Sequence, residues 1–189
     1  MGARLAVARG EGFGSFGHLV VRFAGSLVPA GPSKGSERWA LSHLGPGEAA
    51  LFSSLSGADR RHAVGVARRA LRLAEGLGGA GDEEPAFVAA ALLHDVGKAD
   101  SGLGTFGRVW ATLAALVLGR RRVTAWEGAG GLRSRIAAYL QHDRLGAERL
   151  AVAGSAAFTV SWAREHHLPE ERWTVDRRLG RCLKDADGD

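Results

Sequence analysis

An adjacent histidine and aspartate close an almost wholly apolar segment, where they could together bind a metal ion. The pair is His94-Asp95, which follows the apolar run from Ala86 to Leu93. Burying an imidazole and a carboxylate without partners is costly. Neutral imidazole nitrogen and carboxylate oxygen are both ligands of first-row transition metals, so one metal would satisfy both groups. The pair therefore indicates a metal site at the end of a buried helix.

The same segment also fits an ordinary helix end. After the pair comes Val96-Gly97-Lys98. Gly97 would then be the left-handed cap, Lys98 would face the negative end of the helix dipole, and His94 would be hydrogen-bonded in the core. These residues alone leave both interpretations open, and the other histidines favour the metal site.

Five of the seven histidines fall in the part of the chain with helical periodicity. They are His62, His94, His142, His166 and His167. We treat His18 and His43, in the irregular first third, as surface residues. The intervals from His62 to His94, to His142 and to His166 are 32, 48 and 24 residues. Each interval has room for a helix and a turn, so the ligands would come from different helices that converge on one point.

The order of these residues resembles a known family. His62, then His94-Asp95, then a late aspartate within Leu183–Asp187 resembles the HD-domain superfamily of metal-dependent phosphohydrolases, whose fold is an all-α helical bundle. The likeness covers about residues 57–189. His142 and the pair His166-His167 resemble its dinuclear branch. That branch includes the HD-GYP cyclic-dinucleotide phosphodiesterases, the diadenosine-polyphosphate hydrolases and the mixed-valence diiron oxygenases.

One departure bears on the substrate. The segment after the paired histidines is Leu168-Pro169-Glu170-Glu171-Arg172-Trp173, without Gly-Tyr-Pro. A cyclic dinucleotide is therefore less expected as the substrate than another nucleotide or a related small molecule.

The resemblance implies a ligand set for two divalent transition metals, with iron or manganese expected first and nickel or zinc as alternatives. One metal would take His62, His94, Asp95 and Asp187, the other would take His142 and His166, and Asp95 would bridge them. Periodicity does not choose between Asp185 and Asp187, and the terminal Ala-Asp pattern of the family favours Asp187.

The resemblance also implies a phosphohydrolase. A metal-bridged hydroxide would attack a phosphoester or phosphoanhydride, so no protein nucleophile is needed. Asp95, Lys98 and His167 would be catalytic, and Lys98, Arg144 and His167 would bind substrate phosphate, with Arg164 as a weaker candidate. Two alternatives remain open, a nucleotide sensor without turnover and a diiron oxygenase.

Helical stripes define the elements that would position these residues. We expect helices over residues 58–75, with Asp59 as a possible cap, and over residues 86–93, 132–140, 155–167 and 175–186. His142 lies just after the third of these, and Asp143 is interpreted as a helix cap. Residues 51–189 would form one HD-type domain. Residues 1–50 would form an irregular arm rich in Gly, Pro and Ser, with a short amphipathic helix near His18 to Leu27.

Composition limits the remaining possibilities. With 189 residues, 46% hydrophobic and 24% charged, the chain is that of an ordinary globular domain. The single cysteine, Cys182, excludes an internal disulfide and fits a cytoplasmic location. The longest apolar run, Val109–Leu118, is too short to span a membrane. The net charge of +5 suits a small anionic substrate. Because this apolar run is short, we expect no membrane as partner. We also expect no nucleic acid as partner, since Arg120-Arg121-Arg122 lacks a ladder of stacking aromatics.

Overall fold

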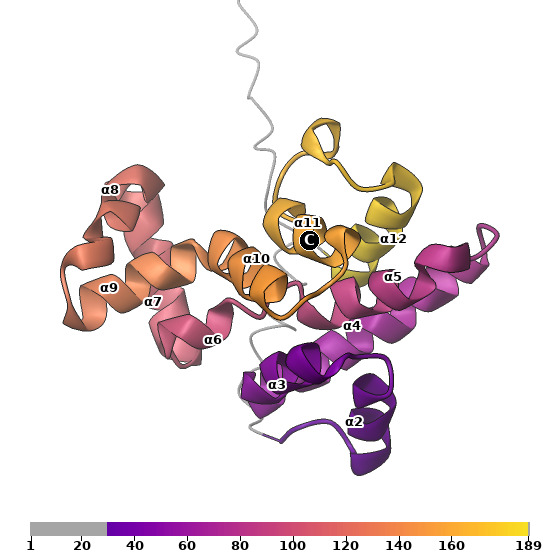
Figure 1. The fold of residues 1–189 in the computed structure, drawn as a ribbon. Helices are drawn as coiled ribbons and strands as arrows, with labels where there is room; N and C mark the ends of the chain where they lie inside the picture. The colour runs from indigo at the N-terminus through magenta and orange to yellow at the C-terminus, as the bar shows by residue number, and fades with distance from the viewer. Residues whose placement is uncertain (1–29, 189) are drawn as a thin grey trace, which may run out of the picture.

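Helix α5, Glu84–Leu93, is the central element of the computed structural model, which describes residues 30–188. Every residue from Phe87 to Leu93 is buried, and Pro85 stands in the first turn, where its missing N–H removes no helical hydrogen bond. A helix that is apolar on all sides must be enclosed by other elements. Helices α3 (Pro46–Ser54), α4 (Gly57–Glu75) and α11 (Ala157–Glu165) pack against it (Figure 1). The expected all-α bundle is confirmed, with no strand among the described residues.

Helix α4 buries one face against α5 and against α12, Arg177–Asp187. Its first turn is capped by the hydroxyl of Ser56, which accepts a hydrogen bond from the N–H of Asp59. The expectation that Asp59 caps this helix is therefore wrong by three positions. Asp176 caps α12 in the same way, accepting from the N–H of Leu179. The two caps fix where the helices that bear His62 and Asp187 begin.

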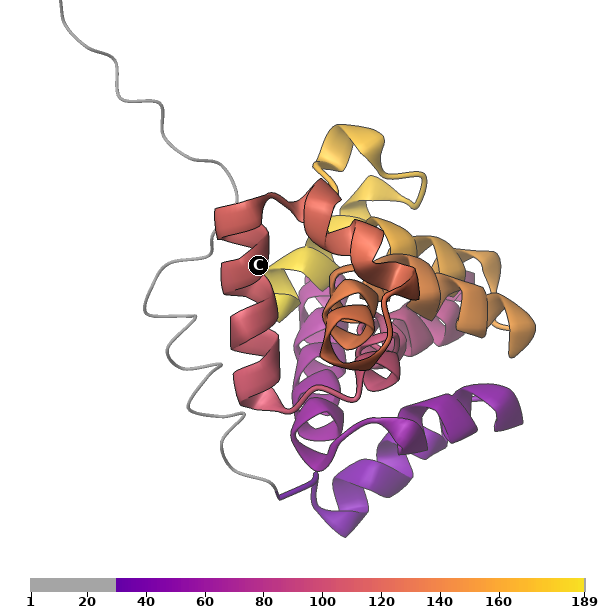
Figure 2. The same ribbon diagram turned by 90° about the vertical axis from the view of Figure 1, so that its left-hand side faces the viewer.

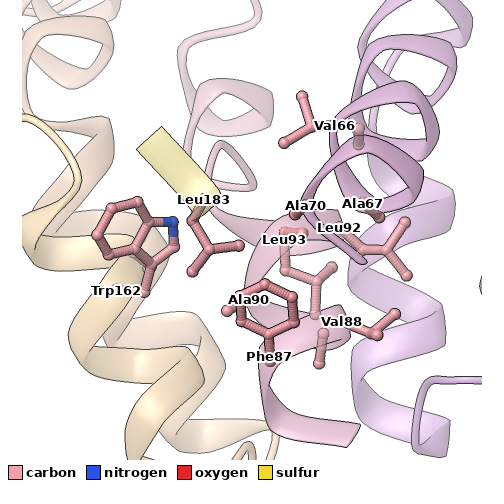
Figure 3. Close-up of a cluster of buried hydrophobic side chains, with 14 of the residues drawn as sticks. Val66, Ala67, Ala70, Phe87, Val88, Ala90, Leu92, Leu93, Trp162 and Leu183 are labelled. Carbon is pink, nitrogen blue, oxygen red and sulfur yellow. The ribbon is translucent and has the colours of Figure 1, made fainter. Parts of the chain in front are cut away.

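Most residues of the main core come from four helices, α4, α5, α11 and α12. Figure 3 shows Val66, Ala67 and Ala70 of α4 facing side chains of α5 such as Leu92 and Leu93. Trp162 of α11 and Leu183 of α12 close the same cluster. Fully burying a side chain of the size of Leu contributes roughly 1.5–3 kcal/mol relative to leaving it exposed. This packing holds the ends of the four helices in fixed relative positions.

A second group of helices lies beside the main core (Figure 1). It consists of α6 (Lys98–Ser101), α7 (Thr105–Leu118), α8 (Arg120–Thr124) and α9 (Gly131–Leu140). Its own apolar cluster contains Leu103, Ala111, Val123, Ile136 and Leu140. Helix α10, His142–Val152, connects the two parts, since it packs against α11 as well as α6 and α9.

The expected irregular arm over residues 1–50 is wrong in its last part. Helix α2, Lys34–Leu41, contacts α4, and α3 contacts α5. Ala40 and Phe52 are buried in the main core. The Ser and Gly residues that resemble a loop in the sequence are partly caps, since Ser33 caps α2 and Gly45 precedes α3. The amphipathic helix expected near His18 to Leu27 lies outside the described residues.

Helix α11 is shorter than the helix expected over residues 155–167. It ends at Glu165, so the paired histidines stand in the turn that follows and not inside the helix.

No helix in the described part of the chain has both the length and the apolar character needed to cross a bilayer.

Candidate metal centre

Three histidines stand at the ends of helices and share one orientation. In His94, His142 and His166 the ring Nδ1–H donates to the backbone carbonyl three residues earlier, at 3.0, 2.8 and 3.0 Å. Carbonyls in the last turn of a helix have no intrahelical partner, so the imidazole satisfies one of them. The bond also fixes the ring orientation and leaves Nε2 as the metal-binding atom.

Asp95 lies between these imidazoles, and its two oxygens face different partners. Oδ2 is 3.3 Å from His94 Nε2 and is also contacted by Lys98 Nζ. Oδ1 is 3.4 Å from His142 Nε2 and 3.8 Å from His166 Nε2. Asp95 therefore offers one oxygen to each set of imidazoles.

The ends of α4 and α12 bring His62 and Asp187 next to His94. His62 Nε2 is 2.8 Å from Asp187 Oδ1, which is 3.8 Å from His94 Nε2. Arg69 on α4 donates to the carbonyl of Ala186 at 2.8 Å and so holds this end of α12 in place. Asp187 is buried whereas Asp185 is exposed, so the tertiary structure brings Asp187 to the centre and leaves Asp185 outside.

The candidate ligand atoms fall into two groups that share Asp95. His62, His94 and Asp95 form one group, and Asp95, His142, His166 and His167 form the other. Within each group the ligand atoms all lie within 4.8 Å of one another. His167 was expected to contact substrate, yet its Nε2 is 3.1 Å from His142 Nε2, so it is also a candidate ligand.

Several of these atoms are buried without a hydrogen-bond partner among the described residues. They are His94 Nε2, Asp95 Oδ1 and His166 Nε2. A buried polar atom that is left unsatisfied costs about 1–3 kcal/mol. Because the three atoms belong to the same centre, cations bound there would satisfy them together, and the residues present fit a metal site.

The charges of the centre also suit a cation. Burial lowers the pKa of His94, but the carboxylates of Asp95 and Asp187 outweigh it and raise that pKa to about 9. Burial raises the pKa of Asp95, yet the charges of Lys98 and His94 hold that pKa well below its usual value. Burial, together with His167 and His94, lowers the pKa of His166 well below its usual value. The metal-free centre thus favours a proton on His94 beside the Asp95 carboxylate, where a metal would replace the proton.

Gly97 is required for a reason that differs from the helix-cap interpretation. Its φ is −65°, so it is not the left-handed cap of the alternative helix-end interpretation. A Cβ at this position would lie 2.0 Å from the carbonyl oxygen of His142 and 2.7 Å from the N of Gly146. The absence of a side chain lets the start of α10 approach the turn after α5. His142 thereby reaches Asp95.

The structure places the expected phosphate-binding residues unequally. Lys98 lies at the centre, in contact with the Asp95 carboxylate. Arg144 does not join it, because Glu127 and Glu148 bind its guanidinium at the surface, each at 2.9 Å. Arg164 is exposed on α11. Asp143 does not cap α10 as expected, since Gln141 occupies the cap position and Asp143 Oδ1 accepts from the N–H of Arg144.

Sequence reasoning missed two residues beside the centre. Tyr139 stacks on the His142 ring, with 5.8 Å between centroids and 25° between planes. Arg108 of α7 forms a two-bonded salt bridge with Asp59 of α4, at 2.7 and 2.8 Å. The sequence contained one signal for the Arg108 contact. Its partner Asp59 stands three positions before His62 and therefore on the same side of the helix.

Comparisons with known proteins bear on this geometry. A family model described as the HD domain matches residues 60–188. The match begins just before His62 and ends after Asp187, so it includes all the candidate ligands. No curated protein and no solved structure matches the chain.

Proposed function

The chain belongs to the HD-domain family, and from this premise we propose that it is a phosphohydrolase with two divalent cations. HD domains form a superfamily of metal-dependent phosphohydrolases, and the buried His/Asp cluster of this chain fits a metal site. The proposed reaction is hydrolysis of a phosphoester or phosphoanhydride in a nucleotide or related small molecule.

One observation carries the proposal, namely the division of the Asp95 oxygens between two groups of imidazoles. A single-metal site needs only one of these groups. Mixed histidine and carboxylate ligation favours iron, manganese, nickel or zinc over magnesium. When bound, such cations supply Lewis acidity and an activated water, so hydrolysis requires no protein nucleophile.

The side chains of the chain itself would then orient the reactants. Asp95 holds the two groups at a fixed separation, while the bonds from Nδ1 to backbone carbonyls keep the imidazoles aimed inward. Lys98 carries a positive charge next to Asp95, where a phosphate oxygen of the substrate would meet it. His167, the exposed member of its group, would face incoming substrate or complete the second set of ligands.

The test combines metal analysis with activity. Protein purified without chelator should contain about two equivalents of transition metal and should hydrolyse members of a panel of nucleotides and simple phosphoesters. Asp95→Asn should lose both metal and turnover, whereas Asp185→Asn, at an exposed aspartate near the same end of the chain, should keep both.

Other outcomes would contradict the proposal. Nucleotide binding that persists without turnover in the metal-loaded protein would point to a sensor. A mixed-valence iron signal with oxygen-dependent activity would point to an oxygenase. One equivalent of metal would remove the bridging role of Asp95.

A further inference from the structure

Helix α7 exposes large apolar side chains along the side that faces away from the rest of the protein. In Figure 2 it is the long helix at the left edge, with no other described helix outside it. Its exposed apolar residues are Val109, Trp110, Leu113, Leu116, Val117 and Leu118. Trp110 is 69% exposed and Val117 is 81% exposed. Contiguous apolar surface of this kind marks an interaction site in most proteins.

The packing of α7 explains why this face stays uncovered within the described chain. Ala111 is fully buried in the second apolar cluster, and Ala114 and Ala115 pack against that cluster. The small alanines therefore face inward, and the large side chains face outward. Since a helix turns by about 100° per residue, Trp110, Leu113 and Val117 share one outer stripe. A helix with its large apolar residues on the solvent side is the reverse of an ordinary surface helix.

Positive charge follows directly after this face. Arg120, Arg121 and Arg122 come after Leu118 and Gly119. The Arg120 guanidinium turns back toward Asp143 at 3.8 Å and donates to the carbonyl of Leu140. Arg121 and Arg122 are exposed, and neither forms an ion pair with any described residue. No aspartate or glutamate occurs between Asp100 and Glu127, so no acidic residue within this segment offsets the arginines.

We propose that α7 and the arginines after it bind the surface of an anionic lipid bilayer. The outer stripe would enter the boundary between headgroups and acyl chains, and Arg121 and Arg122 would contact headgroup phosphates. Tryptophan favours this boundary because its ring is apolar and its N–H is polar. Helix α7 has 14 residues, fewer than the roughly 20 needed to span, so it would lie along the surface.

This proposal revises the expectation that the protein has no membrane partner. The run Val109–Leu118 is too short to span a bilayer, and the sequence alone does not reveal which side of it faces outward. Charge complementarity favours a lipid surface over a second copy of the chain, because Arg121 and Arg122 of two such faces would repel each other. The inference is independent of the proposed hydrolase activity.

Vesicle sedimentation tests the proposal with the full-length chain. The protein should sediment with vesicles of phosphatidylcholine and phosphatidylglycerol at low salt and bind vesicles of phosphatidylcholine alone far less. Val117→Glu should weaken binding to the anionic vesicles by about tenfold or more. Val152→Glu is the matched control, because Val152 is 92% exposed on α10 and lies outside this face. Circular dichroism of each variant checks that it is folded.

A second pair of variants separates the charge contribution. Replacing Arg121 and Arg122 together with glutamine should weaken binding by about 25-fold, since each arginine near an anionic surface contributes about a fivefold gain. The same double change at Arg72 and Arg177, both exposed elsewhere, removes the same net charge and should have little effect.

Three results would overturn the proposal. The first is wild-type protein that stays in the supernatant with anionic vesicles. The second is binding that Val117→Glu leaves unchanged. The third is a dimer in the absence of lipid that Val117→Glu converts to a monomer, since a second copy would then cover the face.

Discussion

His62 and Asp187 are separated by 125 residues, yet His62 Nε2 lies 2.8 Å from Asp187 Oδ1. The contact joins the first turns of α4 to the last turn of α12, and His94 at the end of α5 lies 3.8 Å from the same oxygen. Three helix ends therefore meet at one side of Asp95, while His142, His166 and His167 meet at the other.

This division predicts how metal content responds to substitution. Asp187→Asn should remove about one equivalent of metal, His142→Ala should remove the other, and Asp95→Asn should remove both, because only Asp95 belongs to both groups. Elemental analysis of protein purified without chelator measures the content, with Asp185→Asn as the control. Equal loss of all metal in every variant would show instead that the two groups do not bind independently.

The close approach at Gly97 predicts a backbone requirement. Gly97→Ala would place a Cβ 2.0 Å from the carbonyl of His142, so the start of α10 must move. We expect a loss of about 1–3 kcal/mol in the free energy of unfolding, together with weaker metal binding. Chemical denaturation of the metal-free protein measures the first effect. Gly35→Ala, in a helix with nothing within 4 Å of its Cβ, should be neutral or stabilising by up to about 1 kcal/mol.

The raised pKa of His94 predicts a pH dependence on the alkaline side. The carboxylates of Asp95 and Asp187 raise this pKa, against burial, to about 9 in the folded protein, above its ordinary value of 6.5. The stabilisation is fully present below pH 6.5 and is lost as the pH rises through about 9. The metal-free protein should therefore unfold more easily as the pH rises over this range. His94→Gln should flatten that decline in thermal unfolding measured against pH.

Metal binding should show the opposite trend. A metal must displace the proton of His94, so the metal affinity should rise with pH until His94 is deprotonated at about 9. Titration calorimetry in buffers of different ionisation enthalpy counts the released protons. Binding without proton release near neutral pH would contradict the charged state described for His94.

The salt bridge between Asp59 and Arg108 predicts coupling between α4 and α7. Both side chains are mostly buried, and two hydrogen bonds of 2.7 and 2.8 Å join them. A double-mutant cycle with Asp59→Asn and Arg108→Gln should give a coupling free energy of roughly 0.5–3 kcal/mol. The pair Arg144 and Glu148, exposed on α10, should couple by less than about 1 kcal/mol. Similar values for both pairs would refute the expected effect of burial.

The fold class, the central helix and most of the candidate ligands could be predicted from the sequence. The central helix follows from a local pattern, since an apolar run that ends in His94-Asp95 must be enclosed and its polar end must find partners. The fold class and the full ligand set came from the resemblance to the HD-domain superfamily. The stripe of α4 and that of α12 were visible in the same way, because helical periodicity depends only on residues a few positions apart. Helices α2 and α3 escaped detection because they are short and rich in Gly and Ser.

Which residues meet depends on how the helices pack. Asp185 and Asp187 are equivalent in periodicity, and the docking of α12 on α4 buries one and exposes the other. Arg144 pairs at the surface with Glu127, which lies outside its own helix, and Gly97 is needed because His142 approaches it from a helix far along the chain. The outward side of α7 likewise depends on what packs behind it. Each of these facts depends on a contact between segments distant in sequence, and such contacts leave no trace in local spacing.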